Sequence, residues 1–171
     1  IVILGGGPAG MTAALYSCRA RMKTALVEKA LCGGQVLVAD TIENYPGFPE
    51  GIKGPDLAEW MRKQAERFGL ETRMAEVKSI NGKRGYPQSR TPLRVPYFNV
   101  KLENGETIVS RALIIATGAK WNSLNIPGER ELAGRGVSYC ATCDGPLFRG
   151  KEIAVVGGGD TALEDALFLT R

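Results

Sequence analysis

The chain has 171 residues, of which 44% are apolar and 23% are charged, and this composition is typical of a soluble globular protein. Its net charge of +4, from 22 basic and 18 acidic residues, is too small to favour nucleic-acid binding. We interpret the basic cluster Lys83, Arg84, Arg90 and Arg94 as a solvated loop. No apolar run approaches the ~20 residues of a membrane span, and no signal peptide is visible.

The four cysteines do not suffice for a disulfide scaffold in a chain of this size. They suit a reducing compartment in which one pair is catalytic, so we expect a cytoplasmic protein. Both ends are interpreted as cuts within a longer protein. Ile1 already lies in an apolar run without an initiating Met, and the helix expected from Asp160 to Arg171 ends without a cap.

The chain opens with a predicted strand–helix–strand unit. Residues 1–5 form a short apolar run ending in glycine, which is typical of a buried parallel strand. Helical spacing of apolar residues follows from Pro8 to Arg21, and residues 24–28 predict the second strand. Cys18 falls on the inward face of this helix and is interpreted as a small core residue.

The middle of the chain predicts an amphipathic helix and a hairpin. Residues 54–69 form the helix, which ends at Gly69. Its expected inward side chains are Leu57, Trp60, Met61 and Phe68. Two strands at 97–102 and 107–110 flank Asn104-Gly105, a two-residue hairpin signal.

The last third of the chain repeats the opening pattern. A strand at 112–116 precedes a linker at 121–136, and we place a domain boundary near Ala119 and Lys120. Residues 152–156 then predict another strand, followed by three glycines. This repeat of strand and glycines is the main organisational feature of the sequence.

The first glycine motif, GGGPAG, places Gly5, Gly7 and Gly10 at the G-x-G-x-x-G positions. Glycines there permit a tight turn and close approach of a pyrophosphate, while the helix start offers free N–H groups and a partial positive charge. Glu28 ends the next strand, where its carboxylate can accept hydrogen bonds from ribose hydroxyls. This motif predicts a dinucleotide site, with a plain structural turn as the alternative.

The second motif, VVGGGDTALEDA, places Gly157, Gly159 and Ala162 at the G-x-G-x-x-A positions. Two such motifs predict two dinucleotides, one retained and one exchanged. The strand that would follow is absent from the sequence, so a choice between NADPH and NADH cannot be derived.

The third feature is Cys140-Ala141-Thr142-Cys143-Asp144. Two thiols at this spacing, at a helix start, can close a small disulfide, and the helix end lowers thiol pKa. The alternatives are a zinc half-site or two incidental core cysteines. Zinc normally needs four ligands, whereas the chain has no His and only one CxxC.

Proton transfer at this pair also needs a candidate group. With no His in the chain, Asp144 is the best acid/base candidate, provided that burial raises its pKa. A helix-capping role is the alternative, and the two are compatible. Cys32, which precedes Gly33-Gly34-Gln35 in a predicted loop, is interpreted as incidental, with a peripheral redox role left open.

With these pieces in order, the chain resembles the low-molecular-weight, bacterial-type thioredoxin reductases over its whole length. The matching stretches are GGGPAG, GGQ at 33–35, ENYPGFPEGIKGP at 43–55, ALIIATGA at 112–119, GRGVSYCATCDGPLFRGK at 134–151 and VVGGGDTALEDALFL at 155–169. The combination of CATCD with two glycine motifs in this order is highly specific.

The resemblance implies an α/β fold in two parts. The first is a Rossmann-like, three-layer ββα FAD-binding domain at 1–119 whose C-terminal segment is missing. The second is the start of a Rossmann-like NADPH-binding domain at 120–171, which carries the CxxC. It also implies a homodimer.

The same resemblance implies the contacts of both cofactors. The FAD contacts would be Gly5, Gly6, Gly7, Pro8, Ala9, Gly10, Glu28, Lys29, Gly33, Gly34, Gln35, Asn44 and Val77. The NADPH contacts would be Gly158, Gly159, Asp160 and Thr161. No metal site is implied.

The implied activity is that of an NADPH-dependent thioredoxin-disulfide reductase. Electrons would pass from NADPH to FAD, then to the Cys140–Cys143 disulfide, and finally to thioredoxin. By the family pattern, Cys143 would meet the flavin and Cys140 would be the more accessible thiol that attacks thioredoxin, with Asp144 handling the proton.

The sequence departs from the family at residues 82–96, which we interpret as a lengthened surface hairpin.

Three other classes of protein are alternatives to a thioredoxin reductase, because they share features of this sequence. Alkyl hydroperoxide reductase flavoproteins usually carry other residues between the two cysteines. Dithiol oxidases do not need the second glycine motif, and a flavin-binding protein without turnover has no use for CATCD.

Overall fold

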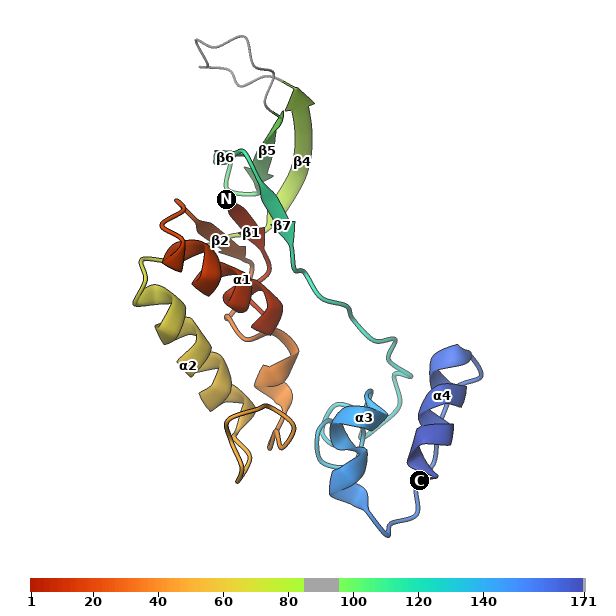
Figure 1. Cartoon of the computed structure of the whole chain (residues 1–171). Helices are drawn as coiled ribbons and strands as arrows, with labels where there is room; N and C mark the ends of the chain where they lie inside the picture. Colours follow the sequence, from red (N-terminus) through yellow and green to blue (C-terminus); the bar gives the residue numbers. More distant parts are fainter. Residues whose placement is uncertain (85–95, 171) are drawn as a thin grey trace. The chain divides into compact units, whose positions relative to one another are not determined.

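The computed structural model describes residues 1–84 and 96–170 (Figure 1). Part of the predicted surface hairpin at 82–96, including Arg90 and Arg94, therefore lies outside the described residues. The chain divides into two compact units. The first unit comprises Ile1–Leu37 and Gly54–Ala119, and the second comprises Val38–Lys53 and the residues from Lys120 onward.

The first unit is built on a parallel sheet with the strand order β3-β2-β1-β7. The strands are β1 (Val2–Leu4), β2 (Ala25–Glu28), β3 (Glu71–Met74) and β7 (Leu113–Ile115). Strand β1 is central, because Val2 pairs with Ala25 on one side and with Leu113 on the other. All three of its residues are buried, which explains the unbroken apolar run: a parallel strand covered on both faces has no polar side to alternate.

Two helices cover one face of this sheet, α1 (Pro8–Arg19) and α2 (Gly54–Glu66) (Figure 1). Ile3 from β1 and Leu26 from β2 pack there against Met11 and Ala14 of α1. Helix α1 starts with Pro8 in its first turn and stops two residues before the predicted end, because Arg21 takes a left-handed conformation. No helix in the described part of the chain combines the length and apolarity needed to cross a membrane.

An antiparallel sheet covers the opposite face, with the strand order β4-β5-β6. Its strands are β4 (Val77–Arg84), β5 (Pro96–Leu102) and β6 (Thr107–Ser110). Val2 and Leu4 of β1 pack against Val100 and Leu102 of β5, so successive residues of β1 serve opposite layers. The α/β, three-layer ββα fold expected for the first part of the chain is therefore confirmed.

The hairpin between β5 and β6 forms where it was predicted, but its turn is of another type. Gly105 N donates to Leu102 O at 3.1 Å, and Leu102 N donates to Glu106 O at 2.9 Å. Gly105 has a φ of 88°, whereas Asn104 does not have a positive φ. This is a three-residue loop with a glycine bulge, because both common two-residue turns need a positive φ at the first central residue, here Asn104.

Helix α2 buries fewer large side chains than the sequence predicts. Leu57 is buried and Met61 packs against the helix–sheet core, but Trp60 and Phe68 are exposed. Phe68 lies after the end of α2, where the guanidinium groups of Arg19 and Arg67 stand 5.4 and 5.9 Å from its ring centroid. The apolar stripe is therefore narrower than the predicted one, and the cation–π contacts accommodate Phe68 outside the core.

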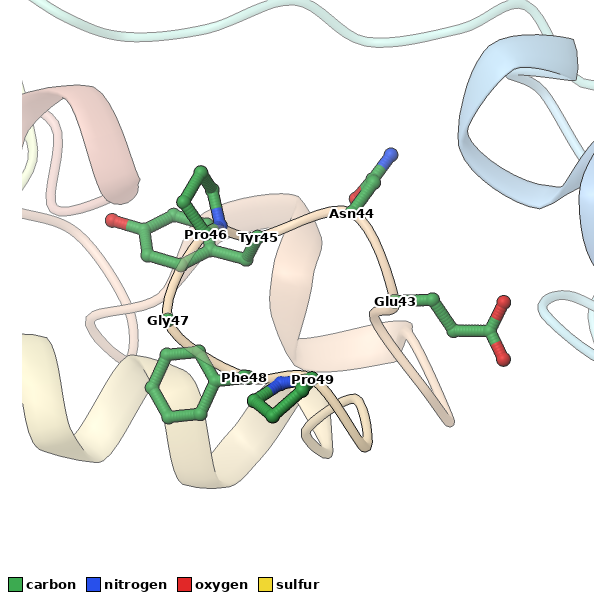
Figure 2. Close-up of a pocket in the computed structure, with 7 residues that line it drawn as sticks. All are labelled: Glu43, Asn44, Tyr45, Pro46, Gly47, Phe48 and Pro49. Carbon is green, nitrogen blue, oxygen red and sulfur yellow. The ribbon is translucent and has the colours of Figure 1, made fainter.

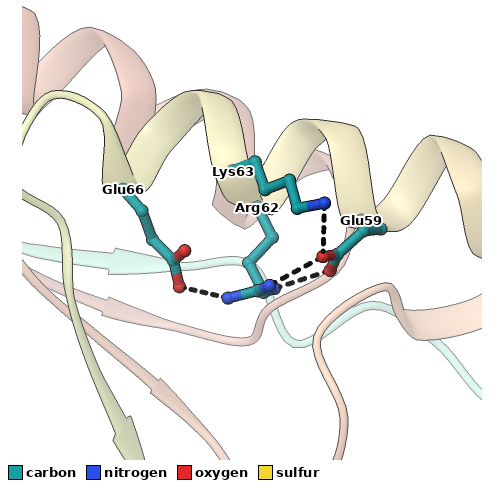
Figure 3. A network of polar contacts seen from close by, with 4 residues as sticks. All are labelled: Glu59, Arg62, Lys63 and Glu66. Atoms are coloured by element: carbon teal, nitrogen blue, oxygen red, sulfur yellow. Dashed lines mark hydrogen bonds and ion pairs between the residues drawn. The ribbon is translucent and has the colours of Figure 1, made fainter.

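The solvent face of α2 carries an ion-pair network of four residues (Figure 3). Arg62 is its centre, with Glu59 at 2.8 Å and Glu66 at 2.5 Å, and Lys63 lies 3.2 Å from Glu59. These pairs have the three- and four-residue spacing that brings side chains together on a helix surface. The two hydrogen-bonded cations lower the pKa of Glu59 to about 2.

The second unit consists of short helices and turns. Its helical segments are α3 (Ala141–Asp144), a 3₁₀ turn at Gly145–Phe148, and α4 (Asp160–Leu169). The strand predicted at residues 152–156 is wrong, because these residues form no strand and are exposed. A parallel strand needs a hydrogen-bonded neighbour, and within the described residues of this unit nothing pairs with the segment.

Candidate nucleotide and redox sites

The first glycine motif joins β1 to α1 at the carboxyl end of the central strand. Gly5 has a φ of 101°, and a Cβ there would stand 2.3 Å from the Ala116 carbonyl oxygen. A Cβ on Gly10 would stand 1.8 Å from the Gly5 carbonyl oxygen. The loop itself therefore requires glycine at both positions, for close packing of strand and helix.

Gly7 is different, because no neighbouring group explains it. It precedes α1 with an ordinary φ of −73°, and the nearest atom to a Cβ there would be Gly34 Cα at 3.9 Å. The described protein would accommodate a Cβ at this position. Glycine at the middle position of this motif is what the close approach of a ligand backbone or pyrophosphate requires.

The carboxylate of Glu28 lies beside this loop, at the end of β2. Its two oxygens accept hydrogen bonds from Gly6 N at 2.7 Å and from Ala30 N at 2.9 Å. Each carboxylate oxygen has a further lone pair, so Glu28 can also accept hydroxyl donors. The structure thus brings the predicted acidic residue to the glycine loop.

A second glycine pair packs against the first. Gly33 N donates to Gly6 O at 2.7 Å, and a Cβ on Gly34 would stand 3.1 Å from Gly7 Cα. Gly33 and Gly34 have φ values of 138° and 59°, both in the region that favours glycine. Gln35 follows and donates from Nε2 to the Ala119 carbonyl at 2.5 Å. The structure therefore brings two segments together at the glycine loop.

Cys32 also borders this loop, and the sequence pattern gave no indication of it beyond its place before Gly33. A Cβ on Gly6 would stand 2.9 Å from its Sγ. Burial, followed by the charge of Glu28, raises the pKa of the Cys32 thiol. A raised pKa disfavours the reactive thiolate, so Cys32 packs here as a half-buried apolar group. Cys18 is buried, as predicted.

The other predicted flavin contacts lie in other segments of the chain. Lys29 is exposed, and Val77 opens β4, where it packs against the core between the two sheets. Asn44 belongs to the second unit and is exposed.

Asn44 lines a pocket formed by one continuous loop (Figure 2). The loop is closed at its base by two backbone hydrogen bonds between Ile42 and Ile52. The aromatic rings of Tyr45 and Phe48 lie near each other in the loop, with their centroids 6.1 Å apart. The Asn44 side chain points outward from the loop (Figure 2). The lining residues are Glu43, Asn44, Tyr45, Pro46, Gly47, Phe48 and Pro49.

The predicted redox pair forms a disulfide at the start of α3. Cys140 is the extended residue that precedes the helix, and its carbonyl accepts hydrogen bonds from Cys143 N and Asp144 N, both at 3.1 Å. The Cα atoms of Cys140 and Cys143 are 5.3 Å apart, within the ordinary range for a disulfide. Within this unit Cys143 is exposed and Cys140 half-buried, the reverse of the order of accessibility that the resemblance implies.

Asp144 lies beside this pair and is half-buried. Its Oδ2 accepts a hydrogen bond from Ser138 Oγ at 2.5 Å. Ser138 Oγ in turn accepts one from Cys140 N at 3.1 Å. Ser138 therefore connects the backbone of the first cysteine to the candidate acid/base group. Its position two residues before Cys140 was the only sequence signal for this role.

The predicted linker contains a second carboxylate that the sequence pattern did not single out. Glu129 is 4% exposed and accepts hydrogen bonds from Tyr139 OH at 2.6 Å, Leu124 N at 2.9 Å and Asn125 N at 2.6 Å. The Tyr139 hydroxyl is the main cause that lowers the pKa of Glu129, and Glu129 in turn raises the pKa of Tyr139.

The second glycine motif precedes α4 in an open setting. Gly157 has a φ of 141°, and a Cβ there would stand 3.0 Å from the Ala162 Cβ. Gly158 and Gly159 have no atom within 4 Å of a built Cβ among the described residues. Asp160 and Thr161 begin α4, and both are exposed. As in the first motif, one glycine, Gly157, is required by the conformation of the loop, whereas Gly158 and Gly159 are not required by any contact among the described residues.

The sequence profile of the pyridine nucleotide-disulphide oxidoreductase family matches residues 1–171, and the chain belongs to this family. Its curated relatives include thioredoxin reductases. It is 49% identical over 171 residues to a bifunctional thioredoxin reductase/thioredoxin of Mycobacterium leprae. It is 45% identical over 172 residues to the thioredoxin reductase of Bacillus subtilis. All of this chain is covered in both cases, but only 35% and 50% of the two relatives.

The fold is likewise similar to that of a solved thioredoxin reductase. The crystal structure of the enzyme from Streptococcus pyogenes matches with a TM-score of 0.88 and 43% identity. The match covers 99% of this chain and 51% of that one. The chain therefore spans about half the length, or less, of these relatives.

Proposed function

We propose that the chain is part of a thioredoxin reductase, a flavoprotein in which the Cys140–Cys143 pair passes reducing equivalents to thioredoxin. The observation that supports this proposal most strongly is the disulfide at the start of α3, in a chain that also has two glycine loops. Residues 1–119 would form most of the FAD-binding domain, and residues 120–171 the start of the NADPH-binding domain. The similarity of the chain to several thioredoxin reductases supports this proposal.

The first glycine loop fits the pyrophosphate and ribose of FAD. Gly7 leaves open the space that a Cβ would occupy, and the start of α1 directs backbone N–H groups toward that space. Glu28 supplies acceptors for ribose hydroxyls. Gly34 has no side chain, so the segment Gly33-Gly34 can lie close to Gly7. The remaining proposed contacts are Gly5, Gly6, Pro8, Ala9, Gly10, Lys29, Gly33, Gln35, Asn44 and Val77.

The second glycine loop fits a nicotinamide dinucleotide in the same way. Gly158 and Gly159 leave the space before α4 open, and Asp160 and Thr161 provide the first backbone N–H groups of that helix. The preference for NADPH is taken from the family resemblance.

When bound, FAD and NADPH supply the electron pair that opens the disulfide. The Cys140 thiolate then attacks the disulfide of thioredoxin, forming a mixed disulfide and releasing one thioredoxin thiolate. Cys143 attacks the Cys140 sulfur, which restores the Cys140–Cys143 disulfide and releases the second thiolate. Asp144, held by Ser138, exchanges the protons that these steps release and consume.

The exposure of the residue Cys143 supports assigning the flavin-facing role to it. A residue whose sulfur meets a cofactor held by another part of the protein has to lie at the surface of its own unit. A cytoplasmic location, expected from the cysteine content, and a homodimeric state, implied by the resemblance, are also part of the proposal.

The test uses two single variants of the full-length protein, Cys140→Ser and Cys143→Ser. A thioredoxin that keeps only the cysteine attacked by the reductase is supplied with that cysteine in a mixed disulfide with thionitrobenzoate. Cys143→Ser should trap it on Cys140, with release of thionitrobenzoate, whereas Cys140→Ser should not. In Cys140→Ser, the remaining Cys143 thiolate should perturb the flavin absorption band. Cys18→Ala, a change at a buried free thiol that is not a member of the pair, is the control and should behave as wild type. Trapping by Cys140→Ser alone would reverse the two roles, and trapping by neither variant would contradict the proposed function.

A further inference from the structure

The Glu129 carboxylate lies buried in the segment that precedes the redox pair. Its two oxygens accept three hydrogen bonds, two from the backbone N–H groups of Leu124 and Asn125 and one from the Tyr139 hydroxyl. Asn125 has a φ of 58°, so the turn that offers these N–H groups adopts a left-handed conformation rarely taken by residues other than glycine. A buried carboxylate with this many donors fixes the groups around it.

Tyr139 is held on a second side by Trp121. The two rings are stacked, with centroids 4.4 Å apart and an angle of 13° between their planes. Tyr139 directly precedes Cys140 in the chain, and Ser138 before it is hydrogen bonded to Asp144. The two residues before the first redox cysteine are thus each tied to a carboxylate, Ser138 to Asp144 and Tyr139 to Glu129.

We propose that Glu129 is a positioning residue for the Cys140–Cys143 pair. Through its hydrogen bond with the Tyr139 hydroxyl, it fixes the backbone before Cys140 and so keeps Cys140 close to Cys143. The inference rests on the proposed function, since it assigns Glu129 a part in the thiol–disulfide exchange of that pair. It goes beyond that function because neither Glu129 nor Tyr139 contacts the sulfurs.

The physical basis is the short length of α3. A helix of four residues holds itself weakly, and Cys140 lies before its first turn with an extended backbone. In the oxidised protein the disulfide itself fixes Cys140. In the reduced protein Cys140 is held by the backbone hydrogen bonds that its carbonyl accepts from the short helix α3 and by the residues before it, so the contact between Glu129 and Tyr139 has a larger part in keeping the two thiols close. Removing this contact gives the dithiol form conformational freedom that the disulfide form does not gain, so the equilibrium shifts toward the dithiol.

The equilibrium is measured against glutathione. Oxidation of the pair transfers two electrons and two protons from the Cys140 and Cys143 thiols to glutathione disulfide. One protein disulfide forms, the glutathione disulfide bond breaks, and two glutathione thiols are released. The fraction of oxidised pair at each ratio of reduced to oxidised glutathione is obtained by acid quenching, alkylation and mass spectrometry. This readout needs neither bound cofactor nor turnover.

Three variants of the full chain are compared with wild type. Tyr139→Phe removes only the hydroxyl and keeps the ring that stacks on Trp121. Glu129→Gln keeps the shape and removes the charge. Glu131→Gln is the matched control, because it makes the same chemical change at an exposed position two residues away. Circular dichroism and the melting temperature are measured for each, and Tyr139→Phe decides the outcome if Glu129→Gln does not fold.

We expect the equilibrium constant for oxidation to fall about three- to tenfold in both Tyr139→Phe and Glu129→Gln, the scale of one lost hydrogen bond. Glu131→Gln should match wild type. Oxidation constants within twofold of wild type in the folded Tyr139→Phe variant would overturn the inference and leave the proposed function intact. A wild-type protein that forms no Cys140–Cys143 disulfide at any glutathione ratio would overturn both.

Discussion

The two glycine motifs of this chain are nearly identical as sequence patterns but have different surroundings in the structure. The first lies between β1 and α1, where β1 is paired on both sides and buried on both faces. The second follows residues 152–156, which form no strand, and precedes α4, which has no buried residue.

This comparison shows that a local sequence pattern is enough to start a helix, whereas a strand forms only if neighbouring strands and layers are present. Both helices begin directly after their glycines, because a helix forms its own hydrogen bonds. The strand before each motif depends on neighbours, and only the first has them among the described residues. A glycine-flanked apolar run therefore indicates a potential strand, and its partners decide whether the strand forms.

The largest expected effect compares equivalent apolar side chains in the two units. Leu57 of α2 is 1% exposed, whereas Leu163 of α4 is 59% exposed. Leu57→Ala should lower the free energy of unfolding by about 2–5 kcal/mol, because it leaves a cavity in the helix–sheet core. Leu163→Ala should change it by less than about 0.5 kcal/mol in this chain. Urea denaturation of the two variants measures both values, and equal losses would show that α4 is packed as tightly as α2.

A smaller effect is expected within the first motif. A Cβ on Gly10 would overlap the Gly5 carbonyl oxygen, and the loop has to shift to admit it. Gly10→Ala should therefore cost roughly 2–3 kcal/mol of folding stability. The comparison variant in the second motif is Gly158→Ala, whose Cβ meets no atom within 4 Å among the described residues and which should leave stability unchanged. A stable Gly10→Ala variant would contradict the close packing of β1 and α1.

The sequence was sufficient for the opening β1–α1–β2 segment of the first unit because its local and long-range signals agree there. Pro8 and the glycines set the start of α1, and the apolar run at 1–5 matched a strand with partners. Trp60 and Phe68 were misplaced because helical spacing does not reveal where the covering sheet ends. The turn at Asn104 was assigned to the wrong type because the same dipeptide suits two loop lengths.

The site was predictable only where a motif carries it. Gly7, Glu28 and the two cysteines stand in patterns with a physical meaning. Glu129 and Tyr139 do not, because ten residues separate them and their contact depends on the path of an irregular segment. Ser138 was missed for a similar reason, since its hydrogen bond to Asp144 closes only when α3 forms.

The smallest expected effect is a pH dependence on the surface of α2. Arg62 and Lys63 lower the pKa of Glu59 from 4.5 to about 2 through side-chain hydrogen bonds. Because the folded-state pKa is the lower one, the stabilisation is fully present above pH 4.5 and is lost as the pH falls toward 2. Glu59→Gln should flatten this part of the stability profile slightly, and high salt should weaken the effect in wild type. Identical profiles from pH 5 to 2 would show that the network contributes nothing measurable.

The most direct test of the account is the flavin content of Gly7→Ala in the full-length protein. The structure leaves room for a Cβ at Gly7, so the variant should melt at the temperature of wild-type protein from which the flavin has been removed. The same Cβ would occupy the space that we assign to the FAD pyrophosphate, so bound flavin, measured from the visible spectrum of the purified protein, should be lost. A melting temperature equal to that of the flavin-free wild type, with lost flavin, is the predicted result. Normal stability with a full complement of flavin would contradict the assignment of this loop as the FAD site.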